Sequence, residues 1–260
     1  MNIITDSFPP SDEPKPMRPA QAGMKPPLPK RFYKEAGVGE HEGLYRLTLD
    51  GRHARTPGRQ ALAVPSRGLA EAVAAEWAGQ GESIDPATMP ITRIVNSAID
   101  GVAPRRAEVI DDLVRYAGSD LVCYRADNPE RLAKAQNAAW SPILEWAKDR
   151  HGARFVLAEG VMHVSQPDES VAAIRQSIET VDSPFAIAAL HVMTTLSGSV
   201  LIALAHADGR VDTDEAWKAA HVDELFQESL WGADQEAMER RRRRWVDFAA
   251  ASTVYRLASK

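Results

Sequence analysis

Alternating apolar and polar residues predict a β-hairpin over residues 44–56. Leu47 and Leu49 alternate with polar neighbours, and Asp50-Gly51 follows them. That dipeptide adopts positive φ easily and is typical of a tight two-residue turn. A further short extended piece is expected near residues 61–64. These segments predict a small antiparallel sheet.

Apolar residues at helical spacing begin directly after the sheet. Ser66 is a good N-cap for a helix in which Leu69, Val73 and Trp77 recur every four residues on one side. Pro90 predicts the start of a second helix with an apolar face, because proline is well tolerated at the first helical position. Helices therefore pack against the small sheet.

The rest of the chain is predicted to be mainly helical. The expected helices run from Pro104 to about Ala117, from Asn128-Pro129 to His151-Gly152, over 168–181, 183–195 and 198–207, from Asp212 to Trp231, and over about 234–258. In residues 153–164 apolar and polar side chains alternate weakly, which suggests a short extended pair. Residues 121–125 are too few to be assigned to a strand or a helix end. Glu215 stands three residues after Asp212 and completes a capping box, and Gly232 fits the position after the last helical residue.

One apolar run is long enough to span a bilayer. Between Pro184 and Ala207 there is no Asp, Glu, Lys or Arg. The Ser197-Gly-Ser199 triplet inside the run is a natural break, and no aromatic belt marks its ends. A pair of buried helices is therefore favoured over a membrane span.

These elements predict an α+β fold with two domains. A Pro-rich tail covers residues 1–29, where eight of the 17 prolines lie, and is expected to be disordered. A β-containing domain over 30–118 and a larger helical domain over 119–260 follow. The boundary between them falls within 100–130.

Composition limits the candidate chemistry. The formal net charge of -5 argues against a general nucleic-acid binder. With the single cysteine Cys123, there is neither an internal disulfide nor a cysteine-based zinc cluster, and its apolar neighbours indicate a buried thiol. The seven histidines show no metal-ligand spacing, and no phosphate-binding loop or nucleophile elbow occurs. We expect no cofactor, no metal and no enzyme activity; a carboxylate/His enzyme with a site between the two domains remains an alternative.

Five consecutive arginines, Arg240 to Arg244, form a second alternative site. They could bind an anionic surface. Five successive helical residues cannot share one face, however. Glu236 and Glu239 precede Arg240 and Arg243 by four residues, the favourable order for helical ion pairs. A solvated, ion-paired helix is therefore favoured over a nucleic-acid or lipid site.

The acidic helix that ends at Trp231-Gly232 is the more informative feature. Helix electrostatics explain the carboxylates at its start. Glu224 and Glu228 instead share one face as like charges, and Glu228 lies in the last turn, where a carboxylate is disfavoured. They indicate a protein-binding surface. The rival interpretation is an interhelical salt bridge, with Gly232 bringing Glu224 near Arg240 or Arg241.

The same helix resembles a known family. The segments that match are Glu215–Ala220, Asp223–Glu228, Trp231–Asp234, Lys30–Tyr33, Glu76-Trp77, Asp120–Arg125, Trp140–Pro142 and Ser199–Leu204. Taken in chain order over about residues 30–258, they appear in the order of the family's own motifs and resemble the chaperones that assemble the catalytic head of F-type ATP synthase. That family includes mitochondrial assembly factor 2 and members from α-proteobacteria.

The resemblance implies a non-enzymatic chaperone that binds the free α subunit and prevents its aggregation. It also implies a small N-terminal domain with an antiparallel sheet and a larger helical domain. Its candidate partner-binding residues, at the matching positions, are Glu224, Gln227, Glu228, Trp231, Asp234 and Glu76. We expect a monomer. The tail lacks a convincing presequence, which favours a bacterial cytoplasmic member over one of the mitochondrial matrix.

Overall fold

The computed structural model describes residues 27–160 and 164–258. Of the tail predicted over residues 1–29, residues 1–26 lie outside the described part of the chain. Within the described chain, the elements are grouped into two compact units that divide between Gly101 and Val102. The sequence placed the domain boundary at 118/119. In the structure the helix over Arg106–Ala117 contacts helices of the C-terminal unit.

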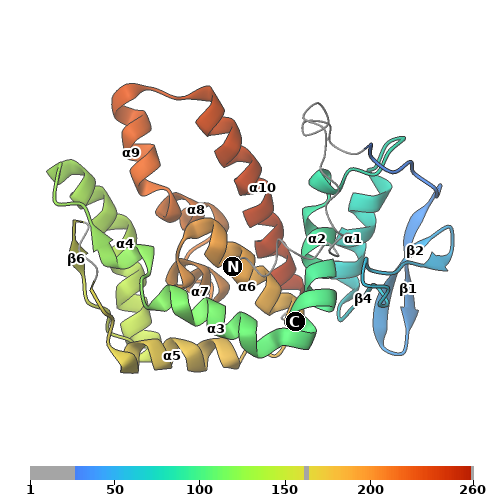
Figure 1. The fold of residues 1–260 in the computed structure, drawn as a ribbon, viewed down its shortest axis with the longest axis horizontal. Helices are drawn as coiled ribbons and strands as arrows, with labels where there is room; N and C mark the ends of the chain where they lie inside the picture. Colours follow the sequence, from blue (N-terminus) through green and yellow to red (C-terminus); the bar gives the residue numbers. More distant parts are fainter. Residues whose placement is uncertain (1–26, 161–163, 259–260) are drawn as a thin grey trace, which may run out of the picture. The chain divides into compact units, whose positions relative to one another are not determined.

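The N-terminal unit contains a small antiparallel sheet (Figure 1). Its strands are β1 (Ala36–His41), β2 (Leu44–Leu49), β3 (Arg52–His53) and β4 (Ala63–Val64). The central strand β2 pairs with all three others, and Thr48 lies opposite His53 in the predicted hairpin. Asp50 and Gly51 both have positive φ, 48° and 76°, which confirms the tight turn between β2 and β3.

Two helices complete this unit: α1 (Arg67–Ala78) and α2 (Pro90–Ser97). The Ser66 hydroxyl accepts a hydrogen bond from the amide of Leu69 at 3.2 Å, so the predicted N-cap of α1 is confirmed. Leu69 and Val73 are fully buried among the sheet residues Leu47 and Val64. The remaining turns are a 3-10 turn at Pro86–Thr88 and a π turn at Ala98–Val102.

The C-terminal unit is built from helices. They are α3 (Arg106–Ala117), α4 (Glu130–His151), α5 (Asp168–Glu179), α6 (Pro184–Ser197), α7 (Val200–Ala207), α8 (Thr213–Ala220), α9 (Val222–Trp231) and α10 (Gln235–Ala258). Short 3-10 turns lie at Ala103–Arg105 and Leu121–Cys123. The fold is therefore α+β, as predicted.

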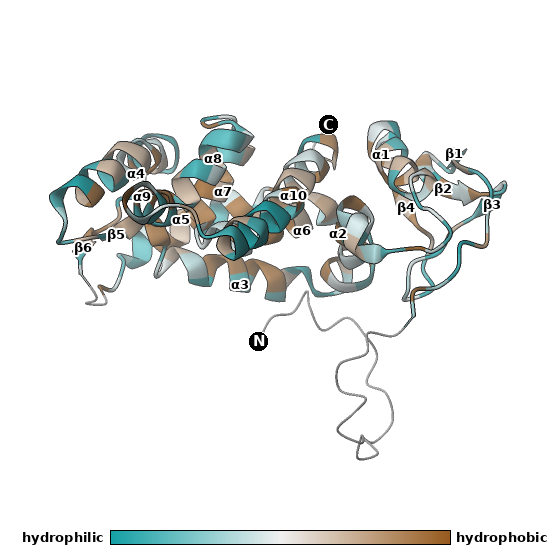
Figure 2. Ribbon diagram, turned by 90° about the horizontal axis from the view of Figure 1, so that it is seen from above, coloured by the Kyte–Doolittle hydropathy of each residue, from teal (hydrophilic) through white to brown (hydrophobic). Residues whose placement is uncertain are grey.

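The uncharged run forms the centre of this unit. It folds as the two helices α6 and α7, which break at Gly198, where φ is 71°. Ten of the 14 residues of α6 are buried, and the apolar colour of both helices is visible in Figure 2. Helices α3, α7 and the second half of α10 pack around α6. No helix in the described residues is long and apolar enough to cross a membrane.

One predicted pairing is wrong. Residues 153–164 were expected to pair with each other. Instead β6 (Ala158–Glu159) lies parallel to β5 (Tyr124–Arg125), and residues 161–163 lie outside the described part of the chain. Parallel partners are distant in sequence, so a local alternation pattern does not reveal them.

Candidate functional site

The candidate site begins at a break between two helices. Asp212 and Glu215 form the predicted capping box at the start of α8. The prediction of one continuous helix up to Trp231 is wrong, because the chain leaves helical geometry at His221, where φ is -124° and ψ is 27°. The buried imidazole donates through Nδ1 to the carbonyl of Trp217 at 2.8 Å. A new helix, α9, then starts at Val222.

Beyond the break lies a helical hairpin that we define as residues 222–247. It consists of α9, the turn over 232–234 and the first half of α10 (Figure 1). None of its residues is buried. Half of the ten exposed large apolar side chains in the described chain belong to it: Leu225, Leu230, Trp231, Met238 and Val246. Isolated exposed apolar residues are ordinary, but a concentration of them indicates an interaction surface.

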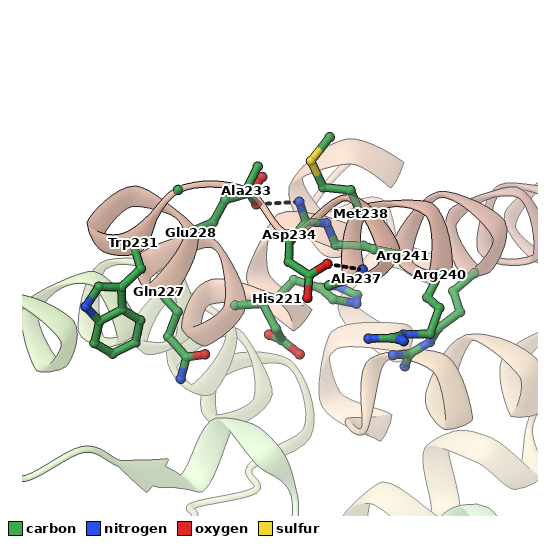
Figure 3. Close-up of a pocket in the computed structure, with 13 residues that line it drawn as sticks. His221, Gln227, Glu228, Trp231, Ala233, Asp234, Ala237, Met238, Arg240 and Arg241 are labelled. Carbon is green, nitrogen blue, oxygen red and sulfur yellow. Dashed lines mark hydrogen bonds and ion pairs between the residues drawn. The ribbon is translucent and has the colours of Figure 1, made fainter.

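A groove of about 620 Å³ lies between the two arms of the hairpin. Figure 3 shows Gln227 and Trp231 of α9 on one side and Arg240 and Arg241 of α10 on the other. The full lining is His221, Glu224, Gln227, Glu228, Trp231, Gly232, Ala233, Asp234, Ala237, Met238, Arg240, Arg241 and Arg244. Five of the six residues predicted to bind a partner therefore line one groove.

An ion pair crosses the groove. Glu228 Oε2 lies 2.5 Å from the guanidinium of Arg241, and both side chains are only about a quarter exposed, 27% and 23%. The interhelical salt bridge expected for Glu224 is therefore formed by Glu228 instead. It also compensates for the unfavourable place of Glu228 in the last turn of α9.

The other arginines of the run also have partners. Arg240 pairs with Glu236 at 2.5 Å, and Glu239 holds Arg242 and Arg243 at 3.3 and 3.1 Å. The two ion pairs predicted at four-residue spacing are confirmed. Arg244 donates to the carbonyl of Leu196 at 2.7 Å. This pairing disfavours the run as an anionic-surface site, because four of its five arginines are held by carboxylates of α9 and α10.

Glu224 has a different environment. The break at His221 places it in the first turn of α9, where the helix dipole favours a carboxylate. The sequence argument that helix electrostatics leave Glu224 unexplained is therefore wrong. Within residues 27–160 and 164–258, its exposed carboxylate makes no hydrogen bond or ion pair. Burial lowers the pKa of the neighbouring His221, although the hydrogen bond to the Trp217 carbonyl and the charge of Glu224 oppose this shift.

The other predicted residues of the hairpin fall into two groups. Gln227 is exposed, and Trp231 is 79% exposed at the end of α9. Asp234 accepts hydrogen bonds from the amides of Glu236 and Ala237 at 2.9 and 3.3 Å. It is the N-cap of α10, which explains its presence without a partner protein.

Glu76 belongs to the N-terminal unit. Its two carboxylate oxygens accept hydrogen bonds from the amides of Ile91 and Thr92, each at 2.7 Å. It therefore caps the N-terminus of α2. Burial raises the pKa of this carboxyl, although hydrogen bonds with Thr92 and Ile91 oppose the rise. The neighbouring Trp77 packs on the buried Tyr33, with ring centroids 5.5 Å apart, but is itself only half-buried at the edge of the core.

Sequence reasoning missed the residues that anchor the hairpin. Gln136 of α4 donates to Asp223 of α9 at 2.7 Å, and its carbonyl accepts from the amide of Ala126 at 2.8 Å. The indole of Trp140 donates to the carbonyl of Ala219 at 2.7 Å. Both side chains are buried. A buried glutamine on an amphipathic helix is a recognisable signal, because such an amide needs specific partners.

The groove lacks most of what an enzyme would need. His221 and Glu224 do line it together, which an acid–base site would require. Nδ1 of the imidazole, however, is bonded to the Trp217 carbonyl, which leaves only Nε2 for proton transfer, and Glu228 is paired with Arg241. No serine, threonine, cysteine, lysine or tyrosine lines this groove. Cys123 is buried, and burial raises its pKa to about 12. In the described residues, no group of three or more His, Cys, Asp or Glu could hold a metal ion.

Comparisons with known proteins agree with this picture. The model of the family described as ATP12 chaperone protein matches residues 30–148. The Atu1473 protein of Agrobacterium tumefaciens, solved as a candidate chaperone, is 46% identical with a TM-score of 0.86, covering 95% of this chain and 92% of that chain. Atp12 of Paracoccus denitrificans is 38% identical with a TM-score of 0.82, covering 88% of this chain and 98% of that chain.

A more distant relative comes from a eukaryote. The mitochondrial protein atp12 of Schizosaccharomyces pombe is 23% identical over 232 residues, 85% of this chain and 79% of the relative. The fold is thus that of a chaperone of the α+β class. The chain belongs to the ATP12 chaperone family.

Proposed function

We propose that this chain captures the unassembled α subunit of the F-type ATP synthase catalytic head and keeps it from aggregating. As a member of the ATP12 chaperone family, the chain is an assembly chaperone for ATP synthase. The α subunit is the client that the resemblance of its motifs implies. On this proposal it acts as a monomer in the bacterial cytoplasm, without a cofactor or a chemical step.

The observation that carries the proposal is the hairpin over residues 222–247. A segment in which no side chain is buried, and which exposes Leu230, Trp231 and Met238, gains little stability from its own fold. Such surface is expected where a partner covers it. Before assembly, the client exposes surface meant for its neighbouring subunit, and binding that state lowers the population that aggregates.

The charged content of the groove fits a partner that must be released. Permanent interfaces are mainly apolar, whereas transient ones carry more polar and charged groups. Here Trp231 and Met238 stand beside Glu224 and Arg240. A groove of this composition supports specific but reversible capture.

The test is capture of the purified α subunit at low salt, with the assembled catalytic head as the control client. We expect binding to the free subunit, no binding to the head, and less light scattering when the subunit is diluted from denaturant. Absence of binding to the free subunit at low salt would contradict the proposal. Equal binding to the assembled head would also contradict it, because the recognised surface would then not be one that assembly covers.

A further inference from the structure

The groove-facing side of α9 carries a regular stripe. Gln227, Glu228 and Trp231 lie three, four and seven residues after Glu224, and all four line the groove. Residues at these spacings share one helix face. Glu224 and Trp231 are two turns apart, which is about 10 Å along the axis. The stripe therefore begins with a carboxylate and ends with an indole.

The charges along this stripe are unequally satisfied. Glu228 is neutralised across the groove by Arg241 at 2.5 Å. On the opposite arm Arg240 is held by Glu236. Glu224 is the exposed carboxylate on the stripe that makes no hydrogen bond or ion pair within the described chain. An ionised carboxylate accepts hydrogen bonds at about four lone-pair sites, so the ligand that it is ready to receive is a cation.

The apolar end of the stripe is equally open. Trp231 is 79% exposed, Leu230 beside it is 50% exposed, and Met238 on the facing arm is 43% exposed. Tryptophan is among the residues most enriched at interface hot spots, and methionine adapts its shape to different partners. This end is suited to a bulky apolar side chain.

We propose that the groove receives a client segment in which a lysine or arginine pairs with Glu224 and a bulky apolar side chain packs on Trp231 and Met238. This inference deepens the proposed function and rests on it for the identity of the client. The separation of about 10 Å fits a basic and an apolar residue seven positions apart on one face of a helix. Gln227 lies between the two ends, and within the described chain its exposed amide makes no hydrogen bond, so it can bind the backbone of the segment.

The first experiment locates the segment. A photo-crosslinking p-benzoylphenylalanine replaces Gln227, the purified α subunit is captured and irradiated, and the joined peptide is identified by mass spectrometry. We expect a helical segment with a lysine or arginine seven positions from a bulky apolar residue. A crosslinked segment without a basic residue at that spacing would overturn the proposal.

The second experiment is a charge exchange. Glu224→Gln should weaken capture of the α subunit about two- to fivefold, the range of a solvent-exposed ion pair, and Glu224→Lys about tenfold or more, because like charges then face each other. Replacing the basic residue of the client by glutamate should restore binding to the Glu224→Lys variant. Glu145→Lys on the exposed part of α4 is the matched control, since it changes the net charge equally outside the groove. Equal losses in both lysine variants, or no restoration, would refute the pairing.

A peptide arm separates this inference from the proposed function. Two fluorescein-labelled 15-residue peptides have identical apolar residues. One carries a lysine, and the other a glutamate, seven positions from a bulky apolar residue. Glu224-dependent binding of the lysine peptide without capture of the α subunit would refute the proposed client but support the chemistry of the groove. Capture of the α subunit that is indifferent to Glu224 would support the client and refute the groove chemistry. Binding of neither would refute both.

Discussion

Glu228 of α9 and Arg241 of α10 are joined by an ion pair of 2.5 Å across the groove of the hairpin. The two residues are 13 positions apart in sequence, and the turn over 232–234 brings them together. Because each is only about a quarter exposed, the pair is better shielded than the ion pairs within α10, where exposed fractions reach 83%. It fixes the spacing of the two arms and so the width of the groove.

A double-mutant cycle measures this pair. We expect Glu228→Ala and Arg241→Ala to couple by about 1 kcal/mol or less in urea unfolding, because water still reaches both groups. The coupling should shrink in high salt. The exposed Glu236–Arg240 pair on one helix serves as the control and should couple less. A Glu228–Arg241 coupling that persists unchanged in high salt would contradict the prediction.

Trp231 offers a way to separate binding from folding. Because the indole is 79% exposed, Trp231→Ala should change the free energy of unfolding by no more than about 0.5 kcal/mol. Capture of the α subunit should weaken about tenfold or more, as for an interface hot spot. Isothermal titration and thermal unfolding measure the two effects. Val156→Ala, at a side chain that is 44% exposed outside the hairpin, is the control and should leave capture unchanged. A Trp231→Ala protein that unfolds, or that binds normally, would contradict the prediction.

The contact between Asp112 and His191 leads us to expect a loss of stability in acid. His191 of α6 is buried, and its Nε2 lies 2.7 Å from Asp112 of α3. Burial acts to raise the pKa of Asp112, but hydrogen bonds from His191 and Arg115 outweigh it and lower the pKa below 3.8. The stabilisation is therefore complete above pH 3.8 and is lost as the pH falls through the lowered value.

Asp112→Asn isolates this contribution. It should reduce the free energy of unfolding by about 1–3 kcal/mol at neutral pH, the range for a hydrogen bond to a charged group. The difference from the unsubstituted protein should narrow in strong acid, where Asp112 is protonated as well. Urea titrations over a series of pH values test this. A difference that stays constant down to the acid limit would show that the charge of Asp112 is unimportant.

Asp120 predicts the opposite pH dependence. It is fully buried, and burial raises its pKa to about 6 even though the Ser199 side chain and the amides of Leu201 and Val122 stabilise the carboxylate. The folded state therefore takes up a proton near pH 6 that the unfolded state takes up only near 3.8. This contribution to stability is present in mild acid and is lost as the pH rises through about 6.

The matching variant is Asp120→Asn. This substitution should remove the contribution of Asp120 to the pH dependence of the unfolding free energy between pH 3.8 and about 6. It should also destabilise the protein by about 1–3 kcal/mol above this range, because the amide nitrogen would face backbone N–H donors and leave one unpaired. Thermal unfolding in closely spaced buffers measures both effects. If the stability of the Asp120→Asn protein depends on pH as steeply as that of the unsubstituted protein, another group is responsible for the dependence.

Local rules identified most of the fold in advance. Ser66, the Asp212–Glu215 capping box and the Asp50-Gly51 turn each use a hydrogen bond or backbone preference within four residues. Such signals depend on neighbours in the chain and can be read without tertiary information. The break at Gly198 is of the same kind, because glycine adopts its positive φ without steric penalty.

Other features depend on distant contacts and were missed. Strand β1 contains Gly37 and Gly39, which are poor strand formers, and its pairing relies on β2 rather than on its own pattern. The break at His221 accompanies burial of its imidazole against Trp217, and that indole in turn packs on the distant rings of Trp245 and Phe248 in α10. Nothing in the local sequence distinguishes this histidine from an ordinary helical residue.

The candidate site was predicted as a set of residues but not as an arrangement. The sequence placed Glu224, Glu228 and Trp231 on one surface, and the structure brings them into one groove. Which carboxylate pairs with an arginine depends on the angle between α9 and α10. A helical pattern does not contain that angle, so the pairing of Glu228 with Arg241 emerged only in three dimensions.

The lack of buried side chains in α9 has a kinetic consequence. Amide protons exchange with solvent when their helix opens locally, and the free energy of that opening depends largely on the apolar contacts that hold the helix. The amides of α9 should therefore exchange far sooner than those of α6, where ten residues are buried. In deuterated water the amides of the two helices would therefore exchange at different rates. Only the exchange rate of α9 would fall when a client occupies the groove.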